Sequence, residues 1–325
     1  MKFPRRRFLQ LAAGAAALPA FSRIAAAQAY PSRPVRIIVP FAAAGPNDII
    51  ARVLGQWLSE RLAHPFVVEN RPGAASNLGT EVVINAAPDG HTVLMVSSPH
   101  AINATLYDKL NFNFIRDTAP VAGIMRIPNV MVVAPSFPAR TVPEFLSYAK
   151  ANPGKLNFAS SGVGASNHMS GELFKAMTGI DMAHVPYRSS GPALTDLFGG
   201  QVQLMIDAMT TTIEHIRANT LRPLAVTSAA RSPLLPETPV MSDFVPGYEV
   251  SNWFGFAVPR KTPADIVTAL NKAVNDALAD PKLKARLVDL GGTTTPGSPD
   301  DFGKLIADET EKWGKVIRTA NIKPD

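Results

Sequence analysis

Short apolar runs alternate with segments of helical periodicity along most of this 325-residue chain. The run at 34–41 is almost continuously apolar, as in a buried strand, whereas apolar residues recur every three or four positions in 47–62, as in a helix. Such patterns predict strands at 34–41, 66–69, 91–97, 128–135, 156–159, 182–187, 201–208, 221–227 and 253–259. They predict helices at 47–62, 76–86, 141–151, 169–177, 191–198, 263–278 and 299–319. This alternation indicates an α/β fold with mostly parallel sheets flanked by helices.

The predicted elements fall into two blocks of similar organisation. The first block covers 30–127, and the second opens with the strand at 128–135 and ends at 249, after a proline-rich stretch. We expect 250–325 to return to the first block, so that lobe 1 is 30–127 plus 250–325 and lobe 2 is 128–249. The chain would then cross between the lobes twice, and the hinged cleft between them would bind a ligand. Three independent segments are the alternative organisation.

The first 29 residues are typical of an export signal. Residues 5–7 are arginines, 9–18 are apolar, and Ala-Gln-Ala at 27–29 is a small-residue cleavage site. The arginines followed by Phe-Leu also fit the twin-arginine export pattern, with Sec export as the alternative. Pro19 interrupts the apolar stretch well short of the ~20 residues that a membrane span needs. We therefore expect cleavage after residue 29 and a mature protein in the periplasm.

Loss of this leader removes most of the net charge. The full chain has 32 Lys and Arg against 26 Asp and Glu, a formal net charge of +6. Five of the 32 basic residues lie in the leader, which leaves 27 against 26 acidic residues in the mature part. The mature chain therefore lacks the basic excess of a nucleic-acid-binding protein, and we expect no nucleic acid partner.

Three loops between a predicted strand and a predicted helix consist mainly of small residues: 42–48 (AAAGPND), 160–168 (SSGVGASNH) and 188–192 (RSSGP). The start of a helix has unpaired N–H groups and a partial positive charge, so it favours an anion, and small side chains let the anion approach. In open α/β sheets such loops lie at the carboxyl ends of the strands, where ligands bind. None of them matches a P-loop or a dinucleotide glycine pattern, which favours a carboxylate over a nucleotide. Ordinary helix capping is the alternative explanation of each loop.

Polar side chains beside these loops are candidate ligand contacts. Asp48 would lie in a first helical turn, where it either caps the helix or contacts the ligand. Asp207 interrupts an apolar strand, and a buried carboxylate without a partner would cost free energy. We therefore expect Asp207 to hydrogen-bond the cleft loops. The alternatives are an ion pair with a ligand ammonium and a plain position at the end of the strand. Ser97 and Ser98 offer hydroxyls after another strand, or form a simple turn. Tyr187 either lines the pocket or belongs to the core.

Little in the sequence points to catalysis. The six histidines form no H-E-x-x-H pair, and no G-x-S-x-G elbow accompanies them. The absence of cysteine excludes disulfides, thiolate metal ligands and thiol nucleophiles. His168, close to Ser160, Ser161 and Ser166, is the arrangement on which a periplasmic hydrolase would depend, and that is the alternative function. We expect a binding protein that is not an enzyme and has no metal or cofactor.

Long motifs throughout the mature chain resemble the Bug family, also called the TctC family, the periplasmic receptors of tripartite tricarboxylate transporters. The motifs are PFAAAGPNDIIAR (40–52), VVENRPGAASNLGT (67–80), PDGHTVLM (88–95), HAINATLY (100–107), LNFASSGVGASNHMSGELFK (156–175), VPYRSSGPALTDLFGGQVQLMID (185–207) and EKWGKVI (311–317). The resemblance implies a two-lobe Venus flytrap fold that binds a small carboxylate: a dicarboxylate, an acidic amino acid or an aromatic acid. It also implies delivery of this ligand to membrane transporter subunits, or its presentation to a sensor kinase.

The loops and the resemblance together predict the ligand site. The first loop matches the family pattern at 43–48 and the second-lobe loop matches it at 160–168, and the strand that bears Asp207 matches too. The expected ligand-binding residues are Phe41, Ala43, Ala44, Gly45, Asn47, Asp48, Ser97, Ser98, Ser160, Ser161, Gly162, Ser166, Asn167, His168, Tyr187 and Asp207.

Overall fold

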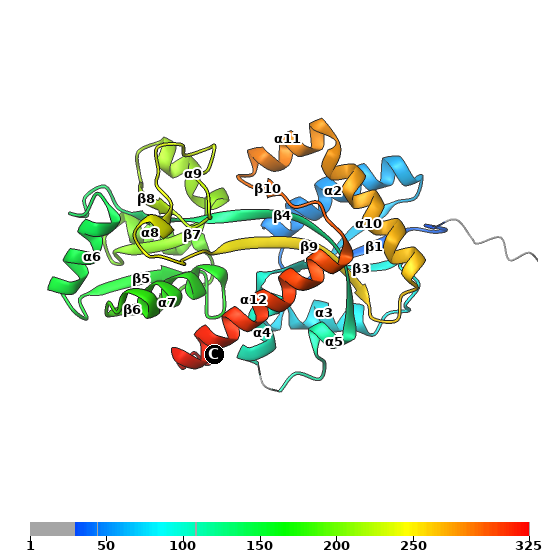
Figure 1. The fold of residues 1–325 in the computed structure, drawn as a ribbon, viewed down its shortest axis with the longest axis horizontal. Helices are drawn as coiled ribbons and strands as arrows, with labels where there is room; N and C mark the ends of the chain where they lie inside the picture. The colour runs from blue at the N-terminus through cyan, green and yellow to red at the C-terminus, as the bar shows by residue number, and fades with distance from the viewer. Residues whose placement is uncertain (1–29, 44, 108, 325) are drawn as a thin grey trace, which may run out of the picture.

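Two long strands run side by side along the length of the molecule and connect its lobes (Figure 1). They are β4 (Thr118–Val133) and β9 (Ser251–Pro259), which pair antiparallel from Thr118↔Pro259 to Pro128↔Ser251 in the computed structural model. The structure describes residues 30–43, 45–107 and 109–324, so the export signal predicted at 1–29 lies outside the described residues. Because β4 continues past Pro128 into the second lobe, one polypeptide strand belongs to both lobes.

The first lobe is built on parallel strands extended by the two long ones. The order is β2-β1-β3-β9-β4, in which β1 pairs parallel with β2 and β3, and β9 pairs antiparallel with β3. Its strands are β1 (Val35–Val39), β2 (Phe66–Asn70), β3 (Thr92–Ser97) and β10 (Thr293–Thr294). Its helices are α2 (Pro46–Leu62), η2 (Ala74–Ser76), α3 (Asn77–Ile84), α4 (Ser98–Leu106), α5 (Phe114–Asp117), α10 (Ala264–Ala279), α11 (Pro281–Asp289) and α12 (Pro299–Thr319).

The second lobe repeats this plan at the far end of β4. Strands β5, β6 and β7 pair parallel, and β4 joins them antiparallel through β7 and also pairs with β8. The strands are β5 (Leu156–Ser160), β6 (Met182–Pro186), β7 (Leu204–Ala208) and β8 (Arg222–Val226). The helices are α6 (Val142–Ala151), α7 (Ser166–Thr178), α8 (Ser190–Phe198), α9 (Met209–Arg217) and η3 (Met241–Asp243). The two-lobe α/β fold predicted from the sequence is confirmed, with parallel core strands and antiparallel crossing strands.

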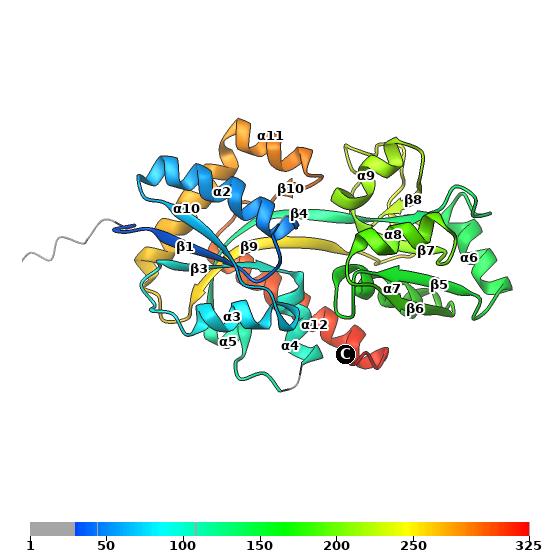
Figure 2. The same cartoon turned by 180° about the vertical axis from the view of Figure 1, so that it is seen from behind.

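Both faces of the sheet are buried, which explains the near-continuous apolar runs. Ile37 belongs to the core on one face and its neighbour Ile38 to the core on the other, and neither is exposed. Helices α2, α8, α9, α10 and α11 pack on the first face, and α3, α4, α6, α7 and α12 on the second. Figure 2, from behind, shows the same division into layers above and below the long strands.

Some predicted elements differ from the observed ones. The strand expected at 128–135 begins ten residues earlier, at Thr118, because its first part pairs with a strand far away in sequence. Helices α4, α9 and α11 were not predicted. Each is only nine residues long, and α4 and α9 begin directly after a strand, so neither has a separating loop that marks its start.

Thr227, which follows β8, connects the two places where the chain crosses between the lobes. Its Oγ1 accepts a hydrogen bond from Asn129 N (2.8 Å) and donates to Val250 O (2.5 Å). Its backbone N–H donates to Asn129 O (2.9 Å), and its carbonyl accepts from Val250 N (3.0 Å). Thr227 is fully buried, so its polar groups cannot hydrogen-bond water. These bonds within the protein satisfy them instead.

We expect Thr227→Val to lower the free energy of unfolding by about 1–3 kcal/mol, because it leaves buried Asn129 N and Val250 O without the hydroxyl. Urea unfolding measures the change. The control is Thr268→Val on the exposed side of α10, which should change the free energy by no more than about 0.5 kcal/mol. Equal losses in both variants would contradict the role of Thr227.

Candidate functional site

A cavity of about 220 Å³ lies between the lobes, against the crossing strands. It opens at the carboxyl ends of the strands of both lobes, where α/β proteins place their ligand sites. The first lobe and the crossing strands contribute Phe41, Pro46, Asn47, Ser97, Pro99, Ile127, Asn252 and Phe254. The second lobe contributes Ser161, Ala165, Ser166, Asn167, Ser190, Asp207, Ala208, Thr210 and Thr211.

Helix starts from both lobes converge on this cavity. Helices α2, α4, α7, α8 and α9 each place a residue of their first turn in its wall. A helix N-terminus carries a partial positive charge of about half an elementary charge and presents unpaired N–H groups. Neither lysine nor arginine is among the described residues that line the cavity. An anion here would therefore be held by backbone dipoles, amides and hydroxyls.

Several polar atoms of the cavity wall are left for a ligand. Within the described ranges, Asn47 Oδ1 and Thr210 Oγ1 are buried without a hydrogen-bond partner, and Ser97 Oγ, which caps the start of α4, keeps its proton to donate. A buried polar group without a partner costs free energy, and a bound ligand would remove that cost. The Ser97 and Thr210 hydroxyls can donate to a carboxylate, whereas Asn47 Oδ1 only accepts and requires a donor group on the ligand.

Asp207 organises the second-lobe loop. Its Oδ1 accepts from Asn167 Nδ2 (2.8 Å) and its Oδ2 from Thr211 Oγ1 (2.7 Å). Asn167 in turn accepts, through Oδ1, from the backbone N (3.1 Å) and Oγ (3.1 Å) of Ser161 and from His168 N (3.0 Å). The expected hydrogen bonding of Asp207 to the cleft loops is present in the structure. The amide of Asn167 is thereby fixed at the start of α7.

The serine and histidine side chains near this loop contact one another and the loop backbone. Ser160 Oγ lies 2.6 Å from Nε2 of His184, not of His168, and the two imidazole rings are stacked with centroids 3.9 Å apart. His168 Nδ1 accepts from Gly164 N (3.1 Å), which requires a neutral ring. Burial, with smaller contributions from His184 and Lys175, lowers the pKa of His168 to about 3. Neither Ser160 nor His168 lines the cavity.

Of the predicted site residues, the structure brings Phe41, Asn47, Ser97, Ser161, Ser166, Asn167 and Asp207 together in the cavity wall. The others lie outside that wall: Ala43, Gly45, Asp48, Ser98, Ser160, Gly162, His168 and Tyr187. Asp48 accepts from Arg52 Nε (3.0 Å) and from Asn70 Nδ2 (3.0 Å), so its carboxylate supports the first loop. Ser98 Oγ accepts from Trp253 N (3.2 Å), and Tyr187 donates to Asp196 (2.6 Å). Ala44 lies outside the described residues.

Sequence reasoning missed several residues of the cavity wall. Ser190 belongs to the third small-residue loop, and Thr210 and Thr211 follow the strand of Asp207 at the start of α9. Ser190 could have been found from its loop, whereas α9 begins directly after β7 without a loop that marks Thr210 and Thr211. Asn252 and Phe254 have no local signal, because only the pairing of β9 with β4 brings them to the cavity.

The described part of the chain offers neither a metal-binding cluster nor a membrane-spanning helix. No group of three or more His, Cys, Asp or Glu residues there could hold a metal ion. Among those same residues, none of the helices combines the length and the apolar character required to cross a bilayer.

Known proteins resemble this chain over most of its length. The family model of the tripartite tricarboxylate transporter family receptor (TctC) matches residues 50–322. Protein BugT of Bordetella pertussis is 36% identical over 300 residues, which cover 91% of this chain and 92% of that protein. The UPF0065 protein in the tcbD-tcbE intergenic region of Pseudomonas sp. is 39% identical over 291 residues, covering 89% of this chain and 87% of that one.

Solved structures agree with this match. Rpa4515 of R. palustris with adipate is 37% identical and has a TM-score of 0.82. The match covers 91% of this chain and 100% of that chain. MatC (Rpa3494) of Rhodopseudomonas palustris with bound malate is 32% identical with a TM-score of 0.78, covering 89% and 100%. The periplasmic binding protein BugD is 32% identical with a TM-score of 0.79, covering 91% and 100%.

Stability should fall in mild acid. Burial lowers the pKa of His168 to about 3 and that of His100 to about 4, from the ordinary value of 6.5. Below pH ~6.5 the unfolded chain binds protons that the folded chain does not, so the free energy of unfolding decreases as the pH falls from ~6.5 towards ~4. The decrease is at most about 1.4 kcal/mol per pH unit for each histidine. Urea titrations across this range measure the slope, which His168→Asn should reduce; an unchanged slope would contradict the assignment.

Proposed function

The chain belongs to the tripartite tricarboxylate transporter receptor family, and we propose that it captures a small carboxylate between its lobes and delivers it to the membrane subunits of such a transporter. It is a solute-binding protein and not an enzyme, like the family and the structural neighbours. Receptors of this family are periplasmic. Cleavage after Ala29 and twin-arginine export are part of the proposal, supported by the sequence of the leader.

The convergence of helix starts on a cavity without lysine or arginine among its described wall residues is the observation that carries the proposal. A carboxylate accepts hydrogen bonds in several directions, and the N–H groups of the helix starts, with the Ser97 and Thr210 hydroxyls, supply donors from both lobes. A ligand that contacts both lobes favours their closure, because it gains contacts in the closed state that the open state lacks.

We propose a short aliphatic dicarboxylate as the ligand class. Phe41, Ile127 and Phe254 add apolar surface to the cavity wall, which suits a methylene chain between two charged ends. The structures of Rpa4515 and MatC, which hold adipate and malate, support this class. Stabilisation by an acidic amino acid or an aromatic acid, and not by a dicarboxylate, would indicate a different ligand class.

The division into lobes at 127/128 and 249/250 is also part of the proposal. It is supported by the end of the β4–β9 pairing at Pro128↔Ser251 and by the start of the β4–β7 pairing at Asn129↔Ala208. Bending of the lobes would then occur around Asn129 and Val250, which Thr227 connects.

Ligand capture is measurable by thermal unfolding of protein freed of bound ligand. A dicarboxylate at about 100 times its Kd should stabilise the folded state by about 2.7 kcal/mol. Mass spectrometry of the compound released afterwards should recover it unaltered. A broad carboxylate panel without any shift would contradict carboxylate capture, and chemical conversion of the ligand would contradict a pure binding protein.

Thr210→Val should weaken dicarboxylate binding about 10- to 100-fold, because a hydrogen bond to a charged group contributes about 1.5–3 kcal/mol. Within the described chain the Thr210 hydroxyl is buried without a partner, so its removal should leave stability unchanged or slightly higher. Isothermal titration calorimetry measures the affinity, with Thr268→Val on α10 as the matched control. Unaltered affinity in Thr210→Val would place the ligand elsewhere.

A further inference from the structure

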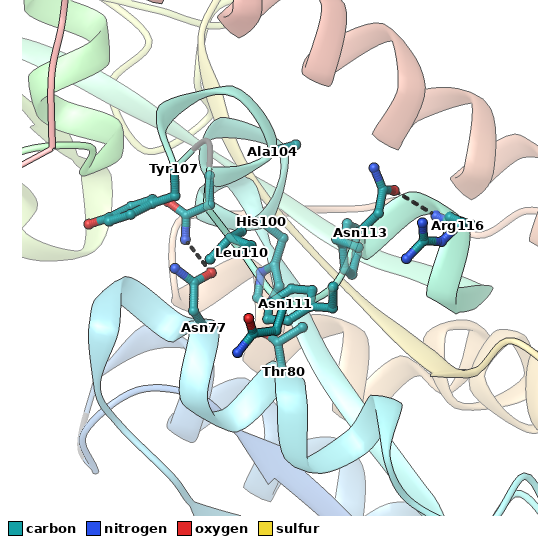
Figure 3. Close-up of a pocket in the computed structure, with 12 residues that line it drawn as sticks. Asn77, Thr80, His100, Ala104, Tyr107, Leu110, Asn111, Asn113 and Arg116 are labelled. Atoms are coloured by element: carbon teal, nitrogen blue, oxygen red, sulfur yellow. Dashed lines mark hydrogen bonds between the residues drawn. The ribbon is translucent and has the colours of Figure 1, made fainter.

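A second cavity, of about 430 Å³, lies in the first lobe away from the interlobe cleft. We call it the α3–α4 pocket. Its walls are α3, α4, α5 and the connection between α4 and α5, and it shares no described wall residue with the cleft cavity. Its inner wall is formed by Asn77, Thr80, His100 and Asn103, each at most 7% exposed. Figure 3 shows His100 at the centre of the group, with Tyr107 and Arg116 at opposite ends.

Buried polar atoms in this inner wall have no protein partner. Throughout the described ranges, neither His100 Nε2 nor Asn103 Oδ1 has a hydrogen-bond partner, although His100 is 3% and Asn103 2% exposed. His100 and Asn103 are three residues apart on α4 and therefore lie on the same face of the helix. Buried polar groups in folded proteins are normally hydrogen-bonded, so these two indicate a missing partner.

The orientation of the Asn103 amide is fixed by its neighbours. Its Nδ2 donates to Ala75 O (2.6 Å) and to Asn77 Oδ1 (3.1 Å). A backbone carbonyl only accepts, so the atom facing Ala75 must be the nitrogen, and Oδ1 is the atom left over. The pocket therefore offers an acceptor at this point, and that acceptor requires a donor.

His100 can either donate or accept through Nε2. Its Nδ1 lies 3.2 Å from Ser97 N and 3.0 Å from Ser97 O, so both neutral tautomers have a partner on that side. Burial lowers the pKa of His100 to about 4, which keeps the ring uncharged at neutral pH. Only a group that is both donor and acceptor can satisfy Nε2 in either tautomer and also donate to Asn103 Oδ1.

The pocket has no charge to offset that of an ionic ligand. The inner wall consists of amides, a hydroxyl and a neutral imidazole. Arg116 at the rim is held by Asp117, with Nε–Oδ1 at 2.6 Å and Nη2–Oδ2 at 2.7 Å, so its charge is already paired. A carboxylate would also meet the acceptor Asn103 Oδ1 without a proton to give it. The chemistry of this pocket thus differs from that of the cleft.

We propose that the α3–α4 pocket is a second binding site, for a small uncharged molecule rich in hydroxyl groups, such as a polyol or a monosaccharide. A hydroxyl donates to Asn103 Oδ1, and a neighbouring hydroxyl meets His100 Nε2 in either tautomer. Phe112 and Phe114 supply apolar faces for the carbon skeleton. This site is independent of carboxylate capture in the cleft.

The test uses the full mature chain and saturation-transfer NMR with glycerol, inositol and glucose as probes at millimolar concentration. We expect at least one probe to bind, and a saturating dicarboxylate in the cleft not to displace it. Side-chain ¹⁵N spectra should show the Nε2 resonance of His100 shifting as the probe is added, because that nitrogen gains a partner.

Ala104→Trp supplies the blocking variant. Ala104 lies exposed at the rim on α4, so a large side chain there closes the mouth without altering the buried inner wall. Probe affinity should fall by about tenfold or more, a loss of about 1.4 kcal/mol by the usual conversion. The control is Ala279→Trp at the exposed end of α10, which should bind as the parent does.

Separate outcomes would overturn the proposal. If no probe binds the parent protein, the pocket holds water only. Equal binding by Ala104→Trp and the parent would place the probe elsewhere, and displacement by the dicarboxylate would place it in the cleft. If no carboxylate binds in the cleft, binding of the probe in the α3–α4 pocket is still measurable, so the two proposals are tested separately.

Discussion

The antiparallel pairing of β4 with β9 is the constraint on which the rest of the structure depends. Because β4 continues into the second lobe, the sheets of both lobes are attached to one polypeptide strand, which pairs with β9 in its first part and with β7 and β8 in its second. The second crossing is fixed from the first lobe, where Lys312 of α12 donates to Glu249 O (2.6 Å) and Glu309 accepts from the Trp253 indole (3.3 Å). The helix starts around the cleft therefore face one another across a short, hydrogen-bonded hinge.

Binding an anion without a cationic side chain has a physical consequence. Backbone dipoles at helix starts are fixed by the fold, so they need little reorganisation when the ligand arrives, whereas a lysine or arginine would lose side-chain entropy. Asp207 is compatible with this arrangement because its oxygens are already hydrogen-bonded to Asn167 and Thr211. Its negative charge holds the second-lobe loop in shape, and the loop presents its own donors to the cavity.

The alternation of apolar runs and helical patterns predicts the strands well, since burial on both faces leaves a plain signal at segments such as 34–41. Local pattern also finds Asn47 and Ser166, because they lie in the loops that it identifies. It cannot find Asn252 or Phe254, since their place in the cavity follows from a register with β4 more than a hundred residues away. Nor does it separate Asp48 from Asp207. Both are acidic residues beside the cleft loops that accept hydrogen bonds from protein groups, and only the fold shows that Asp207 lies in the cavity wall and Asp48 outside it.

Helix α4 borders both cavities, and its start is attached to the hinge. Ser97 and Pro99 face the cleft, whereas His100 and Asn103 face the α3–α4 pocket. Ser98 Oγ accepts from Trp253 N on β9, and the backbone of Ser97 contacts His100 Nδ1. If the lobes close as proposed, movement of β9 would act on the start of α4 through Ser98. The imidazole of His100, whose Nε2 has no partner in the pocket, contacts the backbone of Ser97, which lines the cleft. On the two proposals, the cleft takes a charged ligand and the pocket an uncharged one, so the start of one helix would serve two ligand chemistries.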